Sequence, residues 1–302
     1  MLKNWPLMKN KKILISIVTV AGPNRKTELI RLINSVEKST YKTFEIIVVD
    51  NSQNSKLSSV IQNKYPKVRF IIMTHNTGVL GFNIGFSNSK GEYILSLDDD
   101  CTVNPDTLEN IAKTFPQKPD KVAVISTNIY EPPSKRFIFQ NYLKQKATNL
   151  YISANMAVFR KEIFAKIGYY DKDFFLWVHE DDLSIRILDA GFKIHFEPKI
   201  VVNHYLEPNR PFRKNMAFYL CRNLAWFNIK HISFCYWPLM IIRNLATIFL
   251  MPIKRKAPQA LFYAGLGYLI GWLTFYIPLK KRKVVNKHLQ KKCLKFYFTN
   301  KP

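Results

Sequence analysis

The chain has 302 residues, of which 47% are hydrophobic, enough to build a sizeable core and too many for wholesale disorder. Lysine and arginine number 46 against 21 acidic residues, which gives a net charge of +25. The four cysteines are scattered and form no Cys-x-x-Cys pair, so the composition excludes a disulfide-stapled secreted domain and a thiolate zinc site and indicates a reducing compartment.

Strand-like and helix-like segments alternate through the first 207 residues. Residues 13–20 form a continuous apolar run rich in β-branched side chains, which predicts a strand buried on both faces rather than a signal peptide. The other predicted elements are helices at 26–38, between 52 and 68, at 80–89 and after 104–105, and strands at 44–49, 68–73, 93–97 and 122–126. Repeated strand–helix–strand units predict a mainly parallel sheet with helices on both faces, whose ligands bind beyond the carboxyl ends of the strands.

Three consecutive carboxylates, Asp98, Asp99 and Asp100, follow one of the predicted strands. They repel one another, and a cation bound among them relieves that repulsion. Carboxylate oxygens suit Mg²⁺ or Mn²⁺, and such ions usually hold substrate phosphates as well. The alternative interpretation is a solvated loop that caps the helix beginning at Pro105, and Asp50 by itself is equally typical of a turn.

Two groups of short motifs follow one another over about residues 13–225. The first group comprises 16–19, 45–52, 76–78, 81–85 and 91–100, and the second comprises 154–162, 167–171, 179–186, 191–192 and 201–204. In this order they resemble glycosyltransferase family 2, in its rhamnosyl- and galactofuranosyltransferase-like branch of bacterial surface polysaccharide synthesis. The resemblance implies a Rossmann-like GT-A catalytic domain over residues 1–210. It also implies inverting, metal-dependent transfer of one sugar from a nucleoside-diphosphate sugar.

The resemblance assigns roles to individual residues. Those expected at the donor nucleotide are Thr19, Asp50, Asn76, Asn83, Asp98 and Asp99. Those expected at a Mg²⁺ or Mn²⁺ ion are Asp98, Asp100 and His204, and those expected at the acceptor are Asn155 and Trp177. Asp99 can also take a neighbour's role, because three aspartates in a row blur the register. His204 can instead be a hydrogen-bonded histidine that ends a strand.

The expected catalytic base is Glu180, and a one-residue shift in the alignment would give that role to Asp181. Acids in the first turn of a helix are also favoured simply by the helix's positive end. The base would take a proton from the acceptor hydroxyl while the metal compensates the charge on the leaving diphosphate. One direct displacement of this kind inverts the anomeric configuration. His179 is either a partner of the base or a residue at the rim of the site.

The positive charge is concentrated at the end of the chain. Glu207 is the last acidic residue, and residues 208–302 carry 18 of the 46 basic ones. This shift predicts a boundary near residue 210 and a basic, helical, membrane-associating region over residues 211–302. The basic residues there interrupt long apolar blocks instead of lining a polar face, which disfavours nucleic acid as a partner.

Residues 260–279 form a block of twenty uncharged residues between basic clusters at 254–256 and 280–283. The block is long enough to span a bilayer. Its aromatic side chains and the basic clusters at both ends favour helices that lie in the cytoplasmic face of a membrane, held by apolar burial and anionic lipid. A single span and a buried soluble helix are the alternatives. Deleting residues 233–302 is therefore expected to release the protein to the soluble fraction with donor hydrolysis retained.

The resemblance implies a donor linked to UDP or dTDP and an acceptor that is a glycan or a polyprenyl-diphosphate-linked glycan. Residues 219–224 are similar to an Arg-Asn element on the helix that follows the catalytic domain in this branch. Residues 222–226 lack the Gln-x-x-Arg-Trp element of processive relatives, which favours single additions. A processive polysaccharide synthase and a non-catalytic nucleotide-sugar-binding relative are the alternative functions.

Overall fold

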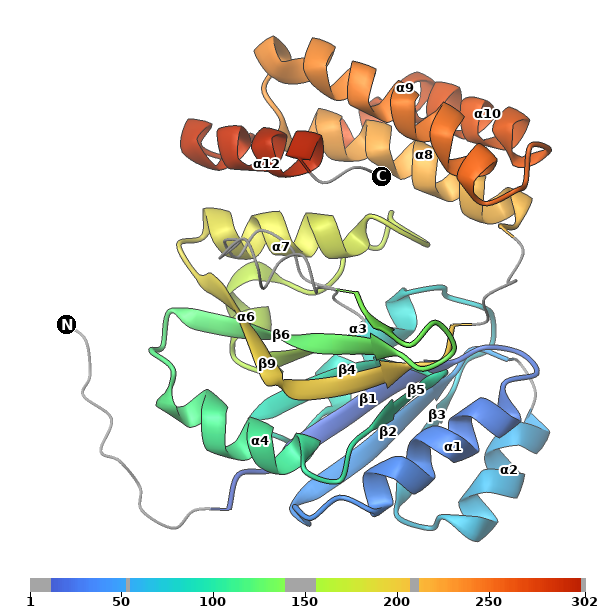
Figure 1. The fold of residues 1–302 in the computed structure, drawn as a ribbon, viewed down its shortest axis with the longest axis vertical. Helices are drawn as coiled ribbons and strands as arrows, with labels where there is room; N and C mark the ends of the chain where they lie inside the picture. Colours follow the sequence, from blue (N-terminus) through green and yellow to red (C-terminus); the bar gives the residue numbers. More distant parts are fainter. Residues whose placement is uncertain (1–11, 53–54, 139–155, 207–211, 300–302) are drawn as a thin grey trace.

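The first four strands form the parallel half of the sheet that the apolar runs predict (Figure 1). The computed structural model describes residues 12–52, 55–138, 156–206 and 212–299. The four strands are β1 (Ile15–Ala21), β2 (Phe44–Asp50), β3 (Val68–Ile72) and β4 (Tyr93–Asp98). They pair in the order β3-β2-β1-β4, and each pair is parallel. Strands β1, β2 and β4 are mostly buried, because helices cover both faces of the sheet.

Each face of the sheet packs against its own set of helices. One face carries α1 (Lys26–Glu37), α2 (Ser55–Lys64) and α4 (Thr107–Thr114), followed by a short 3₁₀ helix, Phe115–Gln117. The other face carries α3 (Leu80–Asn88), α6 (Ile163–Ile167) and α7 (His179–Asp189). In α1 the buried residues are Leu29, Leu32, Ile33 and Val36, the spacing of one helical face. The predicted α/β class with helices on both faces is confirmed.

The second half of the sheet is mixed rather than parallel. Its strands are β5 (Cys101–Val103), β6 (Val122–Glu131), β7 (Arg136–Phe137), β8 (Ala157–Arg160) and β9 (Lys193–His204). β8 runs antiparallel between β4 and β6, β9 runs parallel to β6, and β5 closes antiparallel on β9. The sequence did not predict these directions, because a buried apolar run is compatible with a neighbour of either direction. The β5–β9 pairing sets His204 opposite Cys101, next to Asp100.

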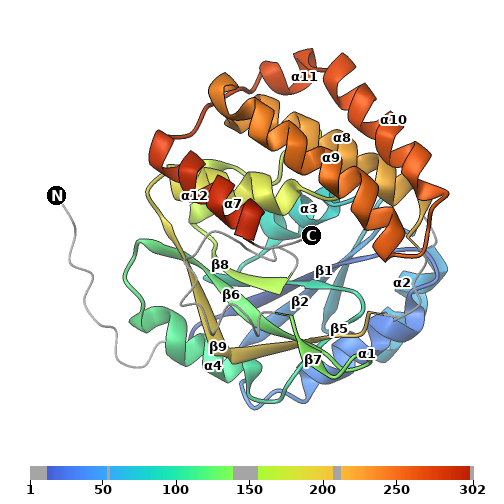
Figure 2. The same cartoon turned by 45° about the horizontal axis from the view of Figure 1, so that its top comes forward.

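A layer of helices lies on the α7 side of the sheet (Figures 1 and 2). In the described residues from 212 onward, its α-helices are α8 (Lys214–His231), α9 (Trp237–Lys254), α10 (Ala260–Leu273), α11 (Tyr276–Leu279) and α12 (Lys287–Thr299). α10 lies closely along α8 because it faces that helix with glycine. A Cβ atom on Gly267 would stand 2.2 Å from the carbonyl oxygen of Phe218, and one on Gly271 would stand 2.7 Å from that of Arg222.

A single span over residues 260–279, the alternative to surface-lying helices, would need one continuous helix, and the structure has two shorter helices there. The helix there ends at Leu273, where the Thr274 hydroxyl donates a 2.6 Å hydrogen bond to the Ile270 carbonyl, and a separate short helix follows. Within the described residues, one helical stretch, Phe234–Lys254, is long and apolar enough to cross a membrane. It buries Met240, Asn244 and Ile248, so one of its faces is packed inside the protein.

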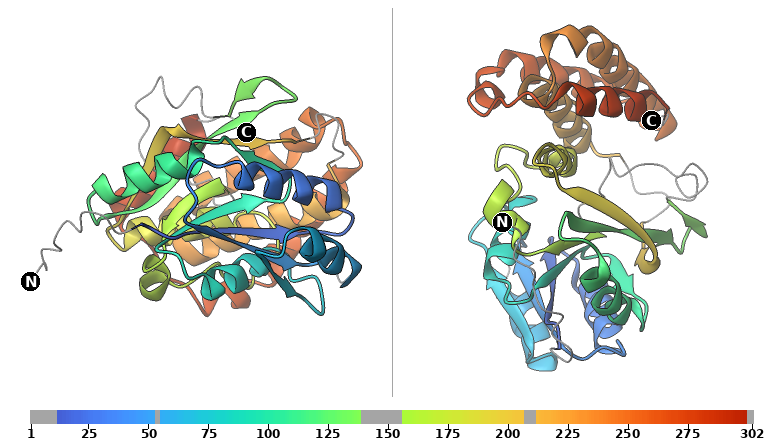
Figure 3. Two further views of the ribbon diagram at one scale, coloured as in Figure 1. Left: turned by 90° about the horizontal axis from the view of Figure 1, so that it is seen from below. Right: turned by 90° about the vertical axis from the view of Figure 1, so that its left-hand side faces the viewer.

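The helical layer and the sheet part share one apolar cluster. Phe174, Val178 and Ile185, from α7 and the loop before it, pack with Leu224 of α8 and with Val285 near the end of the chain. Figure 3 shows α7 between the sheet and the helical layer. Removing residues 233–302 would uncover this cluster beside α7. The packing therefore argues against the active soluble fragment that the sequence led us to expect.

Candidate active site

Two carboxylates flank the end of β1 at the carboxyl edge of the sheet. The strand register sets Asp50 of β2 and Asp98 of β4 opposite the last two residues of β1. Asp50 Oδ1 accepts a 2.8 Å hydrogen bond from the backbone N–H of Ser52. Its Oδ2 and the hydroxyl of Thr19 are buried and, among the described residues, have no hydrogen-bond partner. Buried polar atoms are normally paired, so these two are suited to bind a polar ligand.

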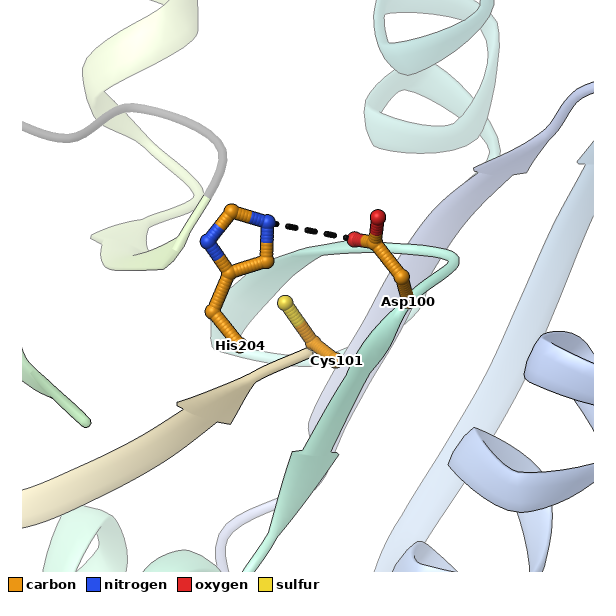
Figure 4. Close-up of side chains that lie close together, drawn as sticks. All are labelled: Asp100, Cys101 and His204. Atoms are coloured by element: carbon orange, nitrogen blue, oxygen red, sulfur yellow. Dashed lines mark ion pairs between the residues drawn. The ribbon is translucent and has the colours of Figure 1, made fainter. Parts of the chain in front are cut away.

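Asp100, Cys101 and His204 lie together where β5 pairs with β9 (Figure 4). Their candidate ligand atoms all lie within 4.8 Å of one another, and His204 Nε2 is 3.3 Å from Asp100 Oδ1. Burial and the adjacent aspartates raise the pKa of the Cys101 thiol well above its usual value, which makes the sulfur a poor ligand. The remaining oxygen and nitrogen donors, together with Asp98, suit a hard divalent cation such as Mg²⁺ or Mn²⁺.

The ionisable groups of this cluster are buried, and burial changes their pKa values. Burial raises the pKa of Asp98 to about 8, and the charge of Asp100 adds to the effect. Burial lowers the pKa of His204, but its hydrogen bond to Asp100 and the charges of both aspartates outweigh that effect and raise it. A divalent cation among these groups would relieve the repulsion between the carboxylates, so the donor set fits the metal that the sequence predicts.

Arg25 is a member of the cluster that the sequence analysis missed. Its guanidinium donates to Asp99 Oδ1 at 2.9 and 3.0 Å and to Asp100 Oδ2 at 2.7 Å. The backbone N–H of Gly22 donates to the other oxygen of Asp99 at 3.1 Å. Asp99, which was expected at the donor nucleotide, therefore accepts hydrogen bonds that stabilise the loop after β1. No sequence signal links Arg25 to aspartates more than seventy residues away.

Glu180 lies in the first turn of α7, behind an unusual backbone turn. Trp177 and Val178 have φ angles of 68° and 63°, in the left-handed region. The Glu180 side chain is 13% exposed, and burial raises its pKa to about 7. Burial lowers the pKa of the preceding His179 to about 4, so this imidazole is neutral near pH 7. A carboxylate that titrates near neutral pH is well suited to accept a proton.

The charges of Glu180 and Asp98 influence each other and both influence Tyr170. Burial raises the pKa of Tyr170 well above its usual value, and the charges of Glu180 and Asp98 both add to the effect. Glu180 also contributes to the raised pKa of Asp98. Both carboxylates thus lie within electrostatic reach of one phenol. The two halves of the predicted site, which are about eighty residues apart in the sequence, thus act electrostatically on the same phenol.

Asp182 of the same helix differs sharply from Glu180. Asp182 is completely buried and accepts hydrogen bonds from Arg186 at 2.8 Å, Lys230 at 2.5 Å and His231 at 2.8 Å. Burial opposes its ionisation, but the charge of Arg186 and the bonds to the other two hold its pKa well below the usual value. Asp181, the alternative base, is partly exposed like Glu180, so exposure does not separate the two candidates.

The remaining predicted site residues differ in whether their side chains are free to bind a ligand. Asn83 uses both amide atoms on Tyr170, donating to its carbonyl at 2.8 Å and accepting from its N–H at 3.0 Å. Asn76 is exposed and accepts a 2.9 Å bond from the N–H of Gly78. Trp177 is partly buried, and its indole N–H has no partner among the described residues. Asn155 lies outside the described residues.

A hollow of about 340 Å³ opens beside the end of β1. It is lined by Pro23, Asn24, Arg25, Lys26, Ser52, Leu57 and Val60. Apolar side chains from α2 therefore face one space with two cations, Arg25 of the loop after β1 and Lys26 at the start of α1. That combination can hold a flat ring together with an anionic group.

The sheet and its aspartate-lined carboxyl edge define a GT-A fold, the class that the sequence led us to expect. A sequence model described as Glycosyl transferase family 2 matches residues 17–168, half of the chain. The chain therefore belongs to glycosyltransferase family 2.

Curated relatives that match the chain are described as sugar transferases. An uncharacterized glycosyltransferase of Haemophilus influenzae is 26% identical over 169 residues, which cover 51% of this chain and 55% of the relative. A glucosyl-dolichyl phosphate glucuronosyltransferase of Haloferax volcanii is 23% identical over 218 residues, covering 63% of this chain and 68% of the relative. The matches thus span about half to two thirds of these relatives.

Among solved structures, a mannosyltransferase of Pyrobaculum calidifontis in complex with GDP-Man and Mn²⁺ superposes with a TM-score of 0.59 and 14% identity. The alignment covers 96% of this chain and 86% of that one. GalNAc-T7 with UDP, GalNAc and Mn²⁺ superposes with a TM-score of 0.58 and 17% identity, covering 73% of this chain and 48% of that one. At these identities the likeness shows the shared fold.

Proposed function

We propose that this chain is an inverting, metal-dependent glycosyltransferase that transfers one sugar from a nucleoside-diphosphate sugar to a glycan or lipid-linked glycan in cell-surface polysaccharide synthesis. The observation that carries the proposal is the pair of Glu180 and Asp98 beside Tyr170, one with a pKa of about 7 and the other in a carboxylate cluster. The family assignment and the Mn²⁺-bound structural neighbours support it.

In this proposal the donor lies along the carboxyl edge of the sheet. Asp50 and Thr19 each offer the nucleoside an oxygen that has no partner among the described residues, and the hollow between Lys26 and Leu57 receives part of it. Asp98, Asp100 and His204 would hold Mg²⁺ or Mn²⁺, which supplies compensation for the charge that develops on the leaving diphosphate.

Glu180 accepts the proton of the acceptor hydroxyl as that oxygen attacks the anomeric carbon. Single displacement inverts the configuration at that carbon. Retention would need a second carboxylate as nucleophile, and the neighbouring Asp182 is already occupied by Arg186, Lys230 and His231. Trp177, whose indole N–H is unpaired among the described residues, is proposed at the acceptor side.

A thermal-shift panel tests the donor and the metal together. UDP, dTDP and GDP are added separately, with and without Mn²⁺, to wild type, Asp50→Asn and Asp100→Asn. We expect a pyrimidine diphosphate with Mn²⁺ to raise Tm, because a ligand at a hundred times its Kd stabilises by about 2.7 kcal/mol. Asp50→Asn should weaken the nucleotide effect, and Asp100→Asn should remove the Mn²⁺ dependence. Stabilisation by none of the diphosphates would sink the proposal.

The acceptor side of the proposal involves the cytoplasmic face of a membrane. The outer surfaces of α9, α10 and α11 expose large apolar side chains, among them Ile242, Phe249, Phe262 and Leu273, each more than half exposed. Lysines and arginines at 254–256 and 280–283 flank this face, and no acidic residue follows Glu207. Apolar burial together with attraction to anionic lipid favours a surface-bound layer.

The packing of α9 favours a helix that lies on the membrane surface and disfavours one that spans the bilayer. Its buried side runs along α8, which itself packs against the sheet part, so α9 cannot enter a bilayer without leaving α8. A surface-bound enzyme could reach a sugar carried on polyprenyl diphosphate. Processive synthesis is the competing function, and the length of the product distinguishes the two.

Vesicle flotation tests the membrane face. Ile242→Asp should lower binding to vesicles of phosphatidylcholine and phosphatidylglycerol about tenfold or more, since burying such a side chain contributes about 1.5–3 kcal/mol. Ile72→Asp, the same change at a site 51% exposed on β3, is the matched control and should bind normally. Equal binding by wild type and Ile242→Asp would count against this face.

A further inference from the structure

The turn that precedes α7 is strained in a way that requires support. Trp177 and Val178 are consecutive left-handed residues, and Val178 is β-branched and buried. Such conformations cost about 1–3 kcal/mol each and persist only where the surroundings impose them. Val178 is also the residue before the first helical position, so its conformation determines where α7 begins.

The support comes from the first helix of the C-terminal layer. Asn223 of α8 is completely buried, and its Nδ2 donates to the carbonyl of Leu176 at 2.7 Å and to that of Trp177 at 2.9 Å. One amide group thus satisfies two carbonyls of the strained turn. The side chain is neutral and carries two N–H donors, whereas an aspartate at this position would set a charge against those carbonyls.

Arg222 orients that amide. Its Nε donates to Asn223 Oδ1 at 3.0 Å, and its Nη2 donates to the carbonyl of Asp173 at 3.0 Å. A guanidinium can only donate, so the amide oxygen must face it and the amide nitrogen must face the turn. The guanidinium lies over the rings of Trp226 at 4.1 Å and Tyr219 at 4.9 Å, which restricts its movement.

The conformation of this turn determines the position of the first residues of α7, the helix that carries Glu180. The carbonyl of Val178 accepts a 3.0 Å bond from the N–H of Asp182, the first rung of α7. Glu180 lies between these two residues, so a change in the turn moves its carboxylate. Displacement of a reacting group by about 1 Å can cost about a hundredfold in rate.

We propose that Asn223, oriented by Arg222, is a positioning residue that holds the Leu176–Trp177 carbonyls and thereby aims Glu180 at the acceptor hydroxyl. This inference rests on the proposed function for its catalytic consequence. Its structural part, the hold on the turn, can be tested independently. Within the described residues, the side-chain hydrogen bonds of Asn223 join it to Arg222 and to the turn, and none joins it to a predicted donor or metal residue.

The test compares two buried asparagines of α8. Asn223→Ala should lower kcat roughly 10- to 100-fold while the KM for the donor and the affinity for nucleotide with Mn²⁺ change less than about twofold. Asn228→Ala is the matched control, since Asn228 is equally buried but has no side-chain partner among the described residues. Its kcat should stay within about twofold of wild type. Asn223→Ser, which keeps one donor, should recover part of the lost rate.

Hydrogen exchange gives a readout that does not depend on activity. Amides of residues 177–183 should exchange faster in Asn223→Ala and Asn223→Ser than in Asn228→Ala, with exchange elsewhere unchanged. Unchanged exchange in this segment, or equal losses of kcat in the two alanine variants, would overturn the inference. If Asn223→Ala does not fold, Asn223→Ser carries both measurements. Failure of the proposed function would be visible separately, as absence of transfer by the wild type.

Discussion

Replacing the base candidate by its isosteric amide, Glu180→Gln, tests the chemistry most directly. General-base catalysis contributes about 10²- to 10⁴-fold, or about 2.7–5.5 kcal/mol of activation free energy. Burial raises the pKa of Glu180 to about 7, so the active carboxylate form is lost as pH falls through that value. With this pKa, about 90% of the groups are ionised at pH 8 and about 1% at pH 5. Wild-type kcat/KM should therefore fall nearly a hundredfold between those pH values.

The assay measures initial release of nucleoside diphosphate from pH 5 to pH 9 at saturating Mn²⁺. Glu180→Gln should be slower by the stated factor and should lose the ionisation near pH 7, while nucleotide with Mn²⁺ still raises its Tm. Asp181→Asn is the control and should remain within a few-fold of wild type. A Glu180→Gln enzyme within tenfold of wild type would refute the reasoning. A defect confined to Asp181→Asn would transfer the role to that residue.

Three further predictions concern the scaffold and the metal. Asp182→Asn removes the charge that pairs buried Lys230, and should lower the unfolding free energy by about 3–5 kcal/mol in urea titrations, whereas a loss below about 1 kcal/mol would contradict the buried pairing. Gly267→Ala forces α10 away from α8 and should destabilise by about 1–3 kcal/mol, while Gly265→Ala, which has open space, should be neutral or stabilising in the same thermal-denaturation measurement. Arg25→Gln frees a carboxylate oxygen of the cluster and should tighten Mn²⁺ binding several-fold by electron paramagnetic resonance, and weaker binding would show that the guanidinium does not compete with the ion.

The sequence predicted the parallel half of the sheet closely. The apolar runs at 44–49 and 93–97 became β2 and β4 with one residue added to each. Strands that are buried on both faces appear as continuous apolar runs, so their limits are easy to locate. Both of these strands also end in a turn-forming aspartate. The directions of β8 and β9 were not predictable, since neither propensity nor periodicity specifies the partner of a strand. The break after Leu273 was missed because composition alone does not mark a helix end inside an apolar block.

The candidate site was predictable where a residue's role follows from its own strand. Asp50 and Asp98 lie at strand ends, and register brings them to one edge. Arg25 was missed, and Asn223 was noted only within an Arg-Asn element without a role, because their hydrogen-bond partners are distant in the chain. Asp99 illustrates the same limit, since it is held by Arg25 and the Gly22 N–H, whereas the adjacent Asp100 also meets His204.

Helix α8 contacts the turn before Glu180 on one side and the glycines of α10 on the other. Packed helices lie about 8–10 Å apart. If the outer apolar face rests on lipid, the two helix-to-helix spacings, α10 to α8 and α8 to α7, place the Glu180 carboxylate at a fixed height of roughly 20 Å above the membrane surface. The enzyme would then select acceptor hydroxyls by their height above the bilayer. Hydroxyls much closer to the membrane or much farther from it would not reach the carboxylate.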